Sequence, residues 1–141
     1  MVWAIRHWVG SVLDHISPES ILSFECKSVS MEGLARPIHS LMSSVLPNSI
    51  NLRWASCIRY RKLVPGERNI LHSIYLAQNN RLDKIFRFSR TWLDLAVCRE
   101  TLSYISIIAN TLQSQNYRFP SRRVRFLSSS RLSAPNFVRA Y

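Results

Sequence analysis

The residues best suited to chemistry in this chain are arginines that lie beside aromatic and aliphatic side chains. They are most numerous in residues 114–141, which read SQNYRFPSRRVRFLSSSRLSAPNFVRAY and contain six arginines and no aspartate or glutamate. Guanidinium groups bind phosphate in a bidentate manner, and aromatic rings stack on unpaired bases. An uncompensated positive segment of this kind therefore attracts phosphate backbones or another polyanion.

A second group of the same kind lies in the middle of the chain, where Arg53 is followed by the run Arg59-Tyr60-Arg61-Lys62. Alternation of cations with aromatic rings is typical of proteins that bind looped or single-stranded RNA. No RNP, KH or zinc-knuckle motif accompanies it, so a sheet edge protected by charge is the alternative interpretation. Ten residues are predicted to contact nucleic acid: Arg53, Arg59, Tyr60, Arg61, Arg118, Phe119, Arg122, Arg123, Arg125 and Arg131.

Ser128 is a candidate phosphorylation site within the C-terminal basic residues. Arg123 and Arg125 precede it by five and three residues, a spacing that basophilic kinases prefer. Phosphate at Ser128 would cancel part of the positive charge and weaken binding to a polyanion. The affinity for RNA before and after phosphorylation tests this hypothesis, and an unchanged affinity would contradict it.

The overall charge supports the same class of partner. The net charge is +11 and the isoelectric point is near 10.6, with sixteen arginines against three lysines. Arginine suits phosphate binding and base stacking better than lysine, which acts as a point charge. The leading prediction is a small non-catalytic basic protein that binds RNA or another polyanion, for example as a component of a ribonucleoprotein.

Codon usage offers a competing explanation for the same composition. Serine, leucine and arginine, the residues with six codons each, make up 53 of the 141 residues. Such an excess is expected of an overprinted or recently arisen reading frame, in which arginine accumulates without selection for binding. The alternative function is therefore an accessory interaction protein, viral or newly arisen, that acts through protein–protein contacts of its helical surface.

The signatures of catalysis, cofactor binding and metal binding are missing from the sequence. There is no Gly-x-Ser-x-Gly, Gly-rich phosphate loop or Cys-x-x-Cys, and tight phosphate loops need glycine, of which the chain has three. His7 and His15 share a helical face but lie about 12 Å apart, too far to bind one metal ion. The sequence predicts a protein that is not an enzyme and has no cofactor or metal.

The three cysteines and the hydropathy indicate an intracellular protein. Cys26, Cys57 and Cys98 are widely spaced, which predicts buried thiols in a reducing compartment, the cytoplasm or nucleus. A mitochondrial location is the alternative, because no acid precedes Asp14. The sequence contains no run of about 18 apolar residues, so no transmembrane segment is predicted. Residues 2–16 could contact a membrane surface peripherally, but the favoured prediction is that their apolar stripe packs into the core.

Apolar residues at three- and four-residue spacing predict the helices that position these groups. Such patterns cover residues 2–16, 33–46, 67–78 and 82–113, the last as one long helix or two collinear ones. Ser17-Pro18-Glu19 is a helix start signal. The residues that follow it, 21–29, alternate as in a strand, but the start signal favours a short helix or an irregular segment. Arg6 and His7 fall on the polar face of the first helix.

Residues 49–64 have a period of two, which predicts a strand whose polar side carries three arginines. Its partner would be residues 21–29 or the alternating residues 123–126. The expected fold class is α+β, mainly α, with four or five helices packed on a long helix in the C-terminal half and a small β element of one or two strands near residues 49–64. Residues 1–113 would form one globular domain, and residues 114–141 a basic tail that is disordered or ordered by a partner.

Overall fold

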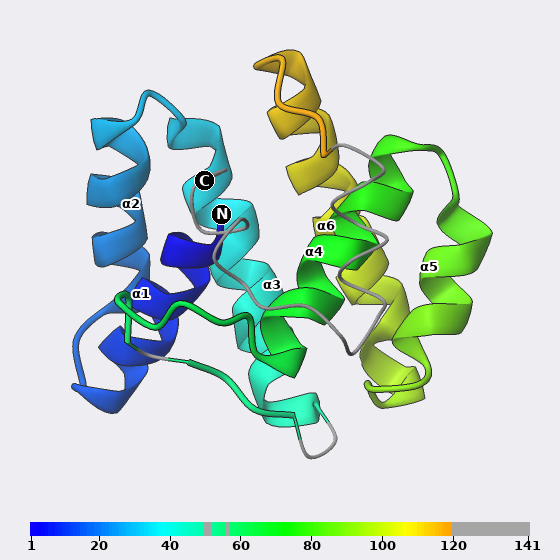
Figure 1. Cartoon of the computed structure of the whole chain (residues 1–141), viewed down its shortest axis with the longest axis horizontal. Coiled ribbons are helices and arrows are strands. Elements are labelled where there is room, and N and C mark those ends of the chain that lie inside the picture. The colour runs from blue at the N-terminus through cyan, green and yellow to red at the C-terminus, as the bar shows by residue number, and fades with distance from the viewer. Residues whose placement is uncertain (50–51, 56, 120–141) are drawn as a thin grey trace.

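A computed structural model describes residues 1–49, 52–55 and 57–119 of the chain. Within these residues the fold is mainly helical, as predicted, and no β-strand is found. Helix α6 packs against α3 and α4, and α1 and α2 pack together on the other side of α3 (Figure 1). The elements in chain order are α1 (Val2–Leu13), α2 (Pro18–Ser28), the short 3-10 helix η1 (Glu32–Leu34), α3 (Ala35–Asn48), α4 (Pro65–Gln78), α5 (Leu82–Ser89) and α6 (Leu95–Ser114).

The predicted helix start at Ser17 and the predicted apolar stripe of residues 33–46 are confirmed. Ser17 caps α2, because its hydroxyl accepts a hydrogen bond from the amide of Ser20 at 3.4 Å, and Pro18 occupies the first turn. The stripe predicted for residues 33–46 is buried over its whole length in η1 and α3. Its members are Leu34, Ile38, Leu41, Met42 and Val45.

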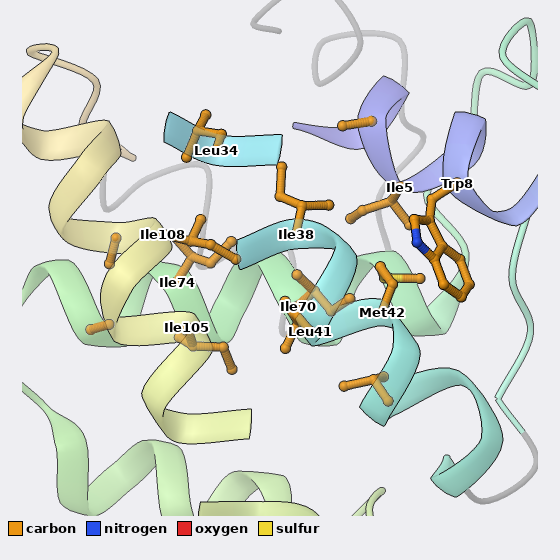
Figure 2. Close-up of a cluster of buried hydrophobic side chains, with 14 of the residues drawn as sticks. Ile5, Trp8, Leu34, Ile38, Leu41, Met42, Ile70, Ile74, Ile105 and Ile108 are labelled. Atoms are coloured by element: carbon orange, nitrogen blue, oxygen red, sulfur yellow. The ribbon is translucent and has the colours of Figure 1, made fainter. Parts of the chain in front are cut away.

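One continuous apolar core lies between α1, α3, α4 and α6 (Figure 2). Helix α3 occupies its centre, and the branched side chains of α4 and α6 meet it on one side while α1 meets it on the other. The apolar stripe of residues 2–16 is divided: its N-terminal part enters this core, whereas Val12, Leu13 and Ile16 stay exposed. The core residues drawn in Figure 2 include Ile5, Trp8, Ile38, Leu41, Met42, Ile70, Ile74, Ile105 and Ile108.

The apolar repeat of residues 82–112 forms two helices, one of the two predicted arrangements, but these helices are not collinear. Helix α5 ends at Ser89, and the chain then reverses so that α5 lies beside α4 and α6 (Figure 1). The reversal is stabilised by the buried side chains of Trp92 and Leu93 and by a hydrogen bond from the amide of Asp94 to the carbonyl of Asn48. Packing of the connection into the core therefore overrides the continuous helical pattern.

The strand predicted over residues 49–64 is not found. Residues 52–55 and 57–64 are irregular, and residues 50, 51 and 56 lie outside the described residues. Ser49 makes a single antiparallel bridge to Leu93. Of the two predicted strand partners, residues 21–29 are largely helical and residues 123–126 lie outside the described residues.

Packing of the chain on the helical body continues past the predicted domain end at residue 113. After α6, Asn116 adopts a positive φ of 63° and turns the chain back toward α4. The side-chain amide of the buried Gln78 donates to the carbonyl of Tyr117 at 2.7 Å and accepts from the amide of Phe119 at 2.9 Å. Residues 114–119 therefore belong to the folded body.

Candidate polyanion-binding surface

Arg6 lies in the interior of the protein, which corrects its predicted place on the polar face of the first helix. It is 1% exposed, and its Nε and Nη2 atoms donate to the two carboxylate oxygens of Glu67 at 2.6 and 2.8 Å. Glu67 is fully buried. A bidentate pair of this kind is the arrangement in which a buried arginine and a carboxylate compensate each other best.

The remaining donors of Arg6 bind the backbone of the irregular segment. Nη1 donates to the carbonyls of Cys57 and Ile58, both at 3.4 Å, and to that of Tyr60, while Nη2 donates to the carbonyl of Lys62 at 3.0 Å. The guanidinium thus satisfies carbonyl groups that a neighbouring strand would otherwise bind. This is the physical reason why a sequence with strand periodicity is held here without a strand partner.

Glu67 connects this segment to helix α4. One of its carboxylate oxygens also accepts a hydrogen bond from the amide of Val64 at 3.1 Å, just before the helix begins at Pro65. A glutamate at this position satisfies a backbone donor that precedes the first helical turn. The ion pair therefore joins α1, α4 and the irregular segment at one buried point.

We call residues 52–55 and 57–64 the basic segment. Its cations Arg53, Arg59, Arg61 and Lys62 are all exposed, and residues 49–64 contain no acidic residue. Tyr60 lies among them and is 43% exposed, with the guanidinium carbon of Arg6 5.9 Å from its ring centre. The segment thus combines a buried anchor for its backbone with side-chain cations that are exposed.

The last described residues lie close to the C-terminal end of this segment. Val2 and Leu71 form a small buried cluster, and both Leu63 and Phe119 pack against it. Phe119, a predicted nucleic-acid contact, is therefore partly buried in the body, whereas its neighbour Arg118 is exposed. The other predicted residues of the tail lie outside the described residues: Arg122, Arg123, Arg125, Ser128 and Arg131.

Gly66 makes the close packing of the basic segment on α4 sterically feasible. Its amide donates to the carbonyl of Arg53 at 3.2 Å, and a Cβ atom at this position would lie 2.7 Å from the ring of Trp54. We expect Gly66→Ala to lower the free energy of unfolding by about 1–3 kcal/mol, because the indole must move. Urea denaturation followed by circular dichroism measures this change.

Gly33 provides the matched control for that substitution. A Cβ atom there would meet Thr111 at 3.5 Å, an ordinary contact, and neither glycine has a positive φ. Gly33→Ala should therefore leave the stability unchanged or raise it slightly. Equal effects of the two substitutions would contradict the role of the Trp54 contact.

The histidines and cysteines do not form a metal site within the described part of the chain. His7 is half-buried rather than solvated and lies 3.7 Å from the carboxylate of Glu25, and His39 accepts a hydrogen bond from the indole of Trp8 at 3.0 Å. Burial raises the pKa of the Cys26 and Cys98 thiols. Cys57 is exposed, contrary to the prediction that all three thiols are buried.

His72 gives the fold a specific dependence on pH. It lies between the rings of Tyr75 and Phe88, and burial lowers its pKa below the ordinary value. The unfolded chain therefore takes up a proton below about pH 6.5 that the folded chain resists. This contribution to stability is full above that pH and is lost progressively as the pH falls from there to the lower pKa of His72 in the folded protein. We expect His72→Phe to reduce this loss.

Urea denaturation of the two proteins at a series of pH values between 7 and 5 measures that difference. The exposed His15, replaced by asparagine because its φ is 56°, is the control that should keep the wild-type dependence. The α-amino group of Met1, whose pKa burial lowers to about 5, contributes with the same sign to every variant. Identical slopes for wild type and His72→Phe would contradict the prediction.

Comparison with protein-family models, curated proteins and solved structures finds no match to this chain. No helix in residues 1–49, 52–55 and 57–119 has the length and apolarity needed to cross a membrane.

Proposed function

We propose that this protein is a non-catalytic basic protein that binds RNA or another polyanion, in isolation or as a component of a ribonucleoprotein. The binding surface would comprise the basic segment, Arg118 and the arginines that follow it. The observation that carries the proposal is the anchoring of this segment by the buried Arg6, together with the exposure of its four cations.

Anchoring favours binding because it reduces the entropy that would be lost on association. A free loop must be ordered when a ligand binds, whereas the carbonyls of this loop are already held by one guanidinium. The net positive charge of the segment is also undiminished by its nearest acid, since Glu67 is fully buried and paired with Arg6. The outer side of the segment thus presents a positive potential to solvent.

Continuity with the tail supports a surface larger than the basic segment alone. Phe119 and Leu63 pack against the same pair of buried side chains, so the chain reaches the start of its remaining arginines close to the basic segment. A ligand bound to the segment could therefore also contact the residues that follow Phe119. Ser128 phosphorylation remains a hypothesis for regulating that second set of contacts.

A salt titration tests the proposed function. The affinity for a fluorescently labelled single-stranded RNA is measured by anisotropy from about 50 mM to about 500 mM salt, and its logarithm should fall linearly with the logarithm of salt concentration. The four cations of the basic segment alone predict a slope near −3, because each phosphate contact contributes about −0.7 on a single strand, and contacts from the arginines that follow Phe119 would make it steeper. Absence of binding at low salt, or an affinity insensitive to salt, would contradict the proposal.

The second candidate is the accessory protein that acts through protein–protein contacts. The observation that favours it is a set of exposed apolar residues on α1, α2 and their connection: Leu13, Ile16 and the 73% exposed Phe24. Exposed apolar groups of this size occur at protein interfaces. If RNA binding is absent at low salt, this candidate remains. A photo-crosslinking amino acid placed at position 24 should then give a discrete protein adduct in cells. The same amino acid placed at the exposed position 99 should give none.

A further inference from the structure

We propose that Tyr60 stacks on a base of the bound nucleic acid, so that the protein prefers single strands to duplexes. This inference rests on the proposed function and specifies its ligand. The juxtaposition that suggests it is an exposed tyrosine ring whose one face is occupied by the guanidinium of the buried Arg6.

Tyr60 is restrained by Arg6 at two places. Its carbonyl accepts a hydrogen bond from Nη1 of Arg6, and its ring centre lies 5.9 Å from the guanidinium carbon, within the range of a cation–π contact. Because Arg6 is almost completely buried, the face of the ring that it occupies is the inner one. The opposite face is not covered by Arg6, and 43% of the residue as a whole is exposed.

A ring held in this way is suited to stacking. An aromatic platform binds a base through its face with little regard to sequence, and a restrained ring loses little conformational freedom when it does so. The adjacent side chains of Arg59 and Arg61 are exposed cations. They can bind phosphates on either side of the stacked nucleotide, so one short run of residues would recognise both base and backbone.

The same chemistry discriminates against a duplex. Bases inside a helix are already stacked on their neighbours, and only the phosphates are presented to a protein surface of this kind. The four cations would contact either form, whereas Tyr60 would add affinity only for the single strand. The alternative is that Tyr60 merely stabilises the basic segment through Arg6 and contacts no ligand.

The experiment compares wild type, Tyr60→Leu and Tyr60→Phe on three ligands of matched charge. These are a single-stranded RNA of about 12 nucleotides, a duplex RNA and a heparin fragment. We expect Tyr60→Leu to lose roughly tenfold in affinity for the single strand and less than twofold for the other two, with Tyr60→Phe close to wild type. Phe24→Leu, which changes an exposed ring on α2, should alter none of the affinities.

A second arm varies the ligand, so that it does not depend on the stability of a variant. An abasic strand keeps the phosphates and lacks the bases, so wild type should bind it roughly tenfold more weakly than the intact strand. Equal losses of Tyr60→Leu on all three ligands, or no loss on any, would overturn the role of Tyr60 while leaving polyanion binding intact. Failure of wild type to bind any of the three at low salt would instead overturn the proposed function.

Discussion

Replacing Arg6 by methionine is expected to lower the free energy of unfolding by about 3–5 kcal/mol, because it leaves the carboxylate of Glu67 buried without its cation. The substitution also removes the donor that binds the carbonyls of residues 57, 58, 60 and 62. Domains are stable by about 5–15 kcal/mol in total, so the variant would be close to unfolding. Urea denaturation followed by circular dichroism measures the loss.

The reciprocal and double substitutions separate the ion pair from the backbone contacts. Glu67→Met should be similarly destabilising, since it leaves the guanidinium buried without a counter-charge. The double variant should be more stable than the sum of the two losses predicts, because no unpaired charge remains. What it fails to recover is the contribution of the hydrogen bonds from Arg6 to the carbonyls and from the amide of Val64 to Glu67.

Arg36 supplies the control for this series. It is an exposed arginine in the first turn of α3, and Arg36→Met should change the stability by less than about 0.5 kcal/mol. A loss of less than about 1 kcal/mol for Arg6→Met would contradict the assignment of Arg6 as the anchor of the basic segment, since a broken buried pair costs more than that.

Neutralising the basic segment should have the largest effect on binding. Replacing Arg53, Arg59, Arg61 and Lys62 by glutamine should reduce the steepness of the salt dependence by about 3, four contacts at about 0.7 each. If wild type and the variant have the same affinity for RNA at 1 M salt, the affinity of the variant at 0.1 M salt should be up to about 10³-fold lower than that of wild type. The fold should be retained, because all four side chains are exposed. Anisotropy titrations with single-stranded RNA measure both quantities.

The matched control removes the same charge from another surface. Arg81, Lys84, Arg87 and Arg90 are exposed cations in and beside α5, and their replacement by glutamine also lowers the net charge by four. If the basic segment is the binding surface, this variant should keep most of the affinity and salt dependence. Equal losses in the two variants would show that binding follows the overall charge alone. The salt dependence that remains after the basic segment is neutralised would measure the contribution of residues 114–141.

Much of the helical framework could be predicted because it depends on local patterns. The stripe from Leu34 to Val45 and the cap at Ser17 are encoded in residues a few positions apart, and both are observed. Each apolar residue at helical spacing gains by packing on one face, whichever element it meets there. The positive charge of residues 49–64 and of the tail is likewise a property of the sequence alone.

The features that were mispredicted depend on contacts between distant parts of the chain. The apolar repeat of residues 82–112 continues across Ser89, yet burial of Trp92 and Leu93 reverses the chain there. Residues 49–64 have the period of a strand, but a period identifies which side chains share a face and supplies no hydrogen-bond partner. Within the described residues, part of the hydrogen bonding that a neighbouring strand would supply comes from Arg6 of α1.

The sequence by itself therefore determined the helical class, most of the core stripes and the arginine-rich character of two segments. Only the tertiary structure decided that Arg6 is buried, that it is paired with a glutamate 61 residues away, and that residues 117–119 return to α4 through Gln78. The physical reason is that a lone arginine on a helix is most stable in water unless a carboxylate and several carbonyls are brought to it. No spacing along the chain states which distant groups will do so.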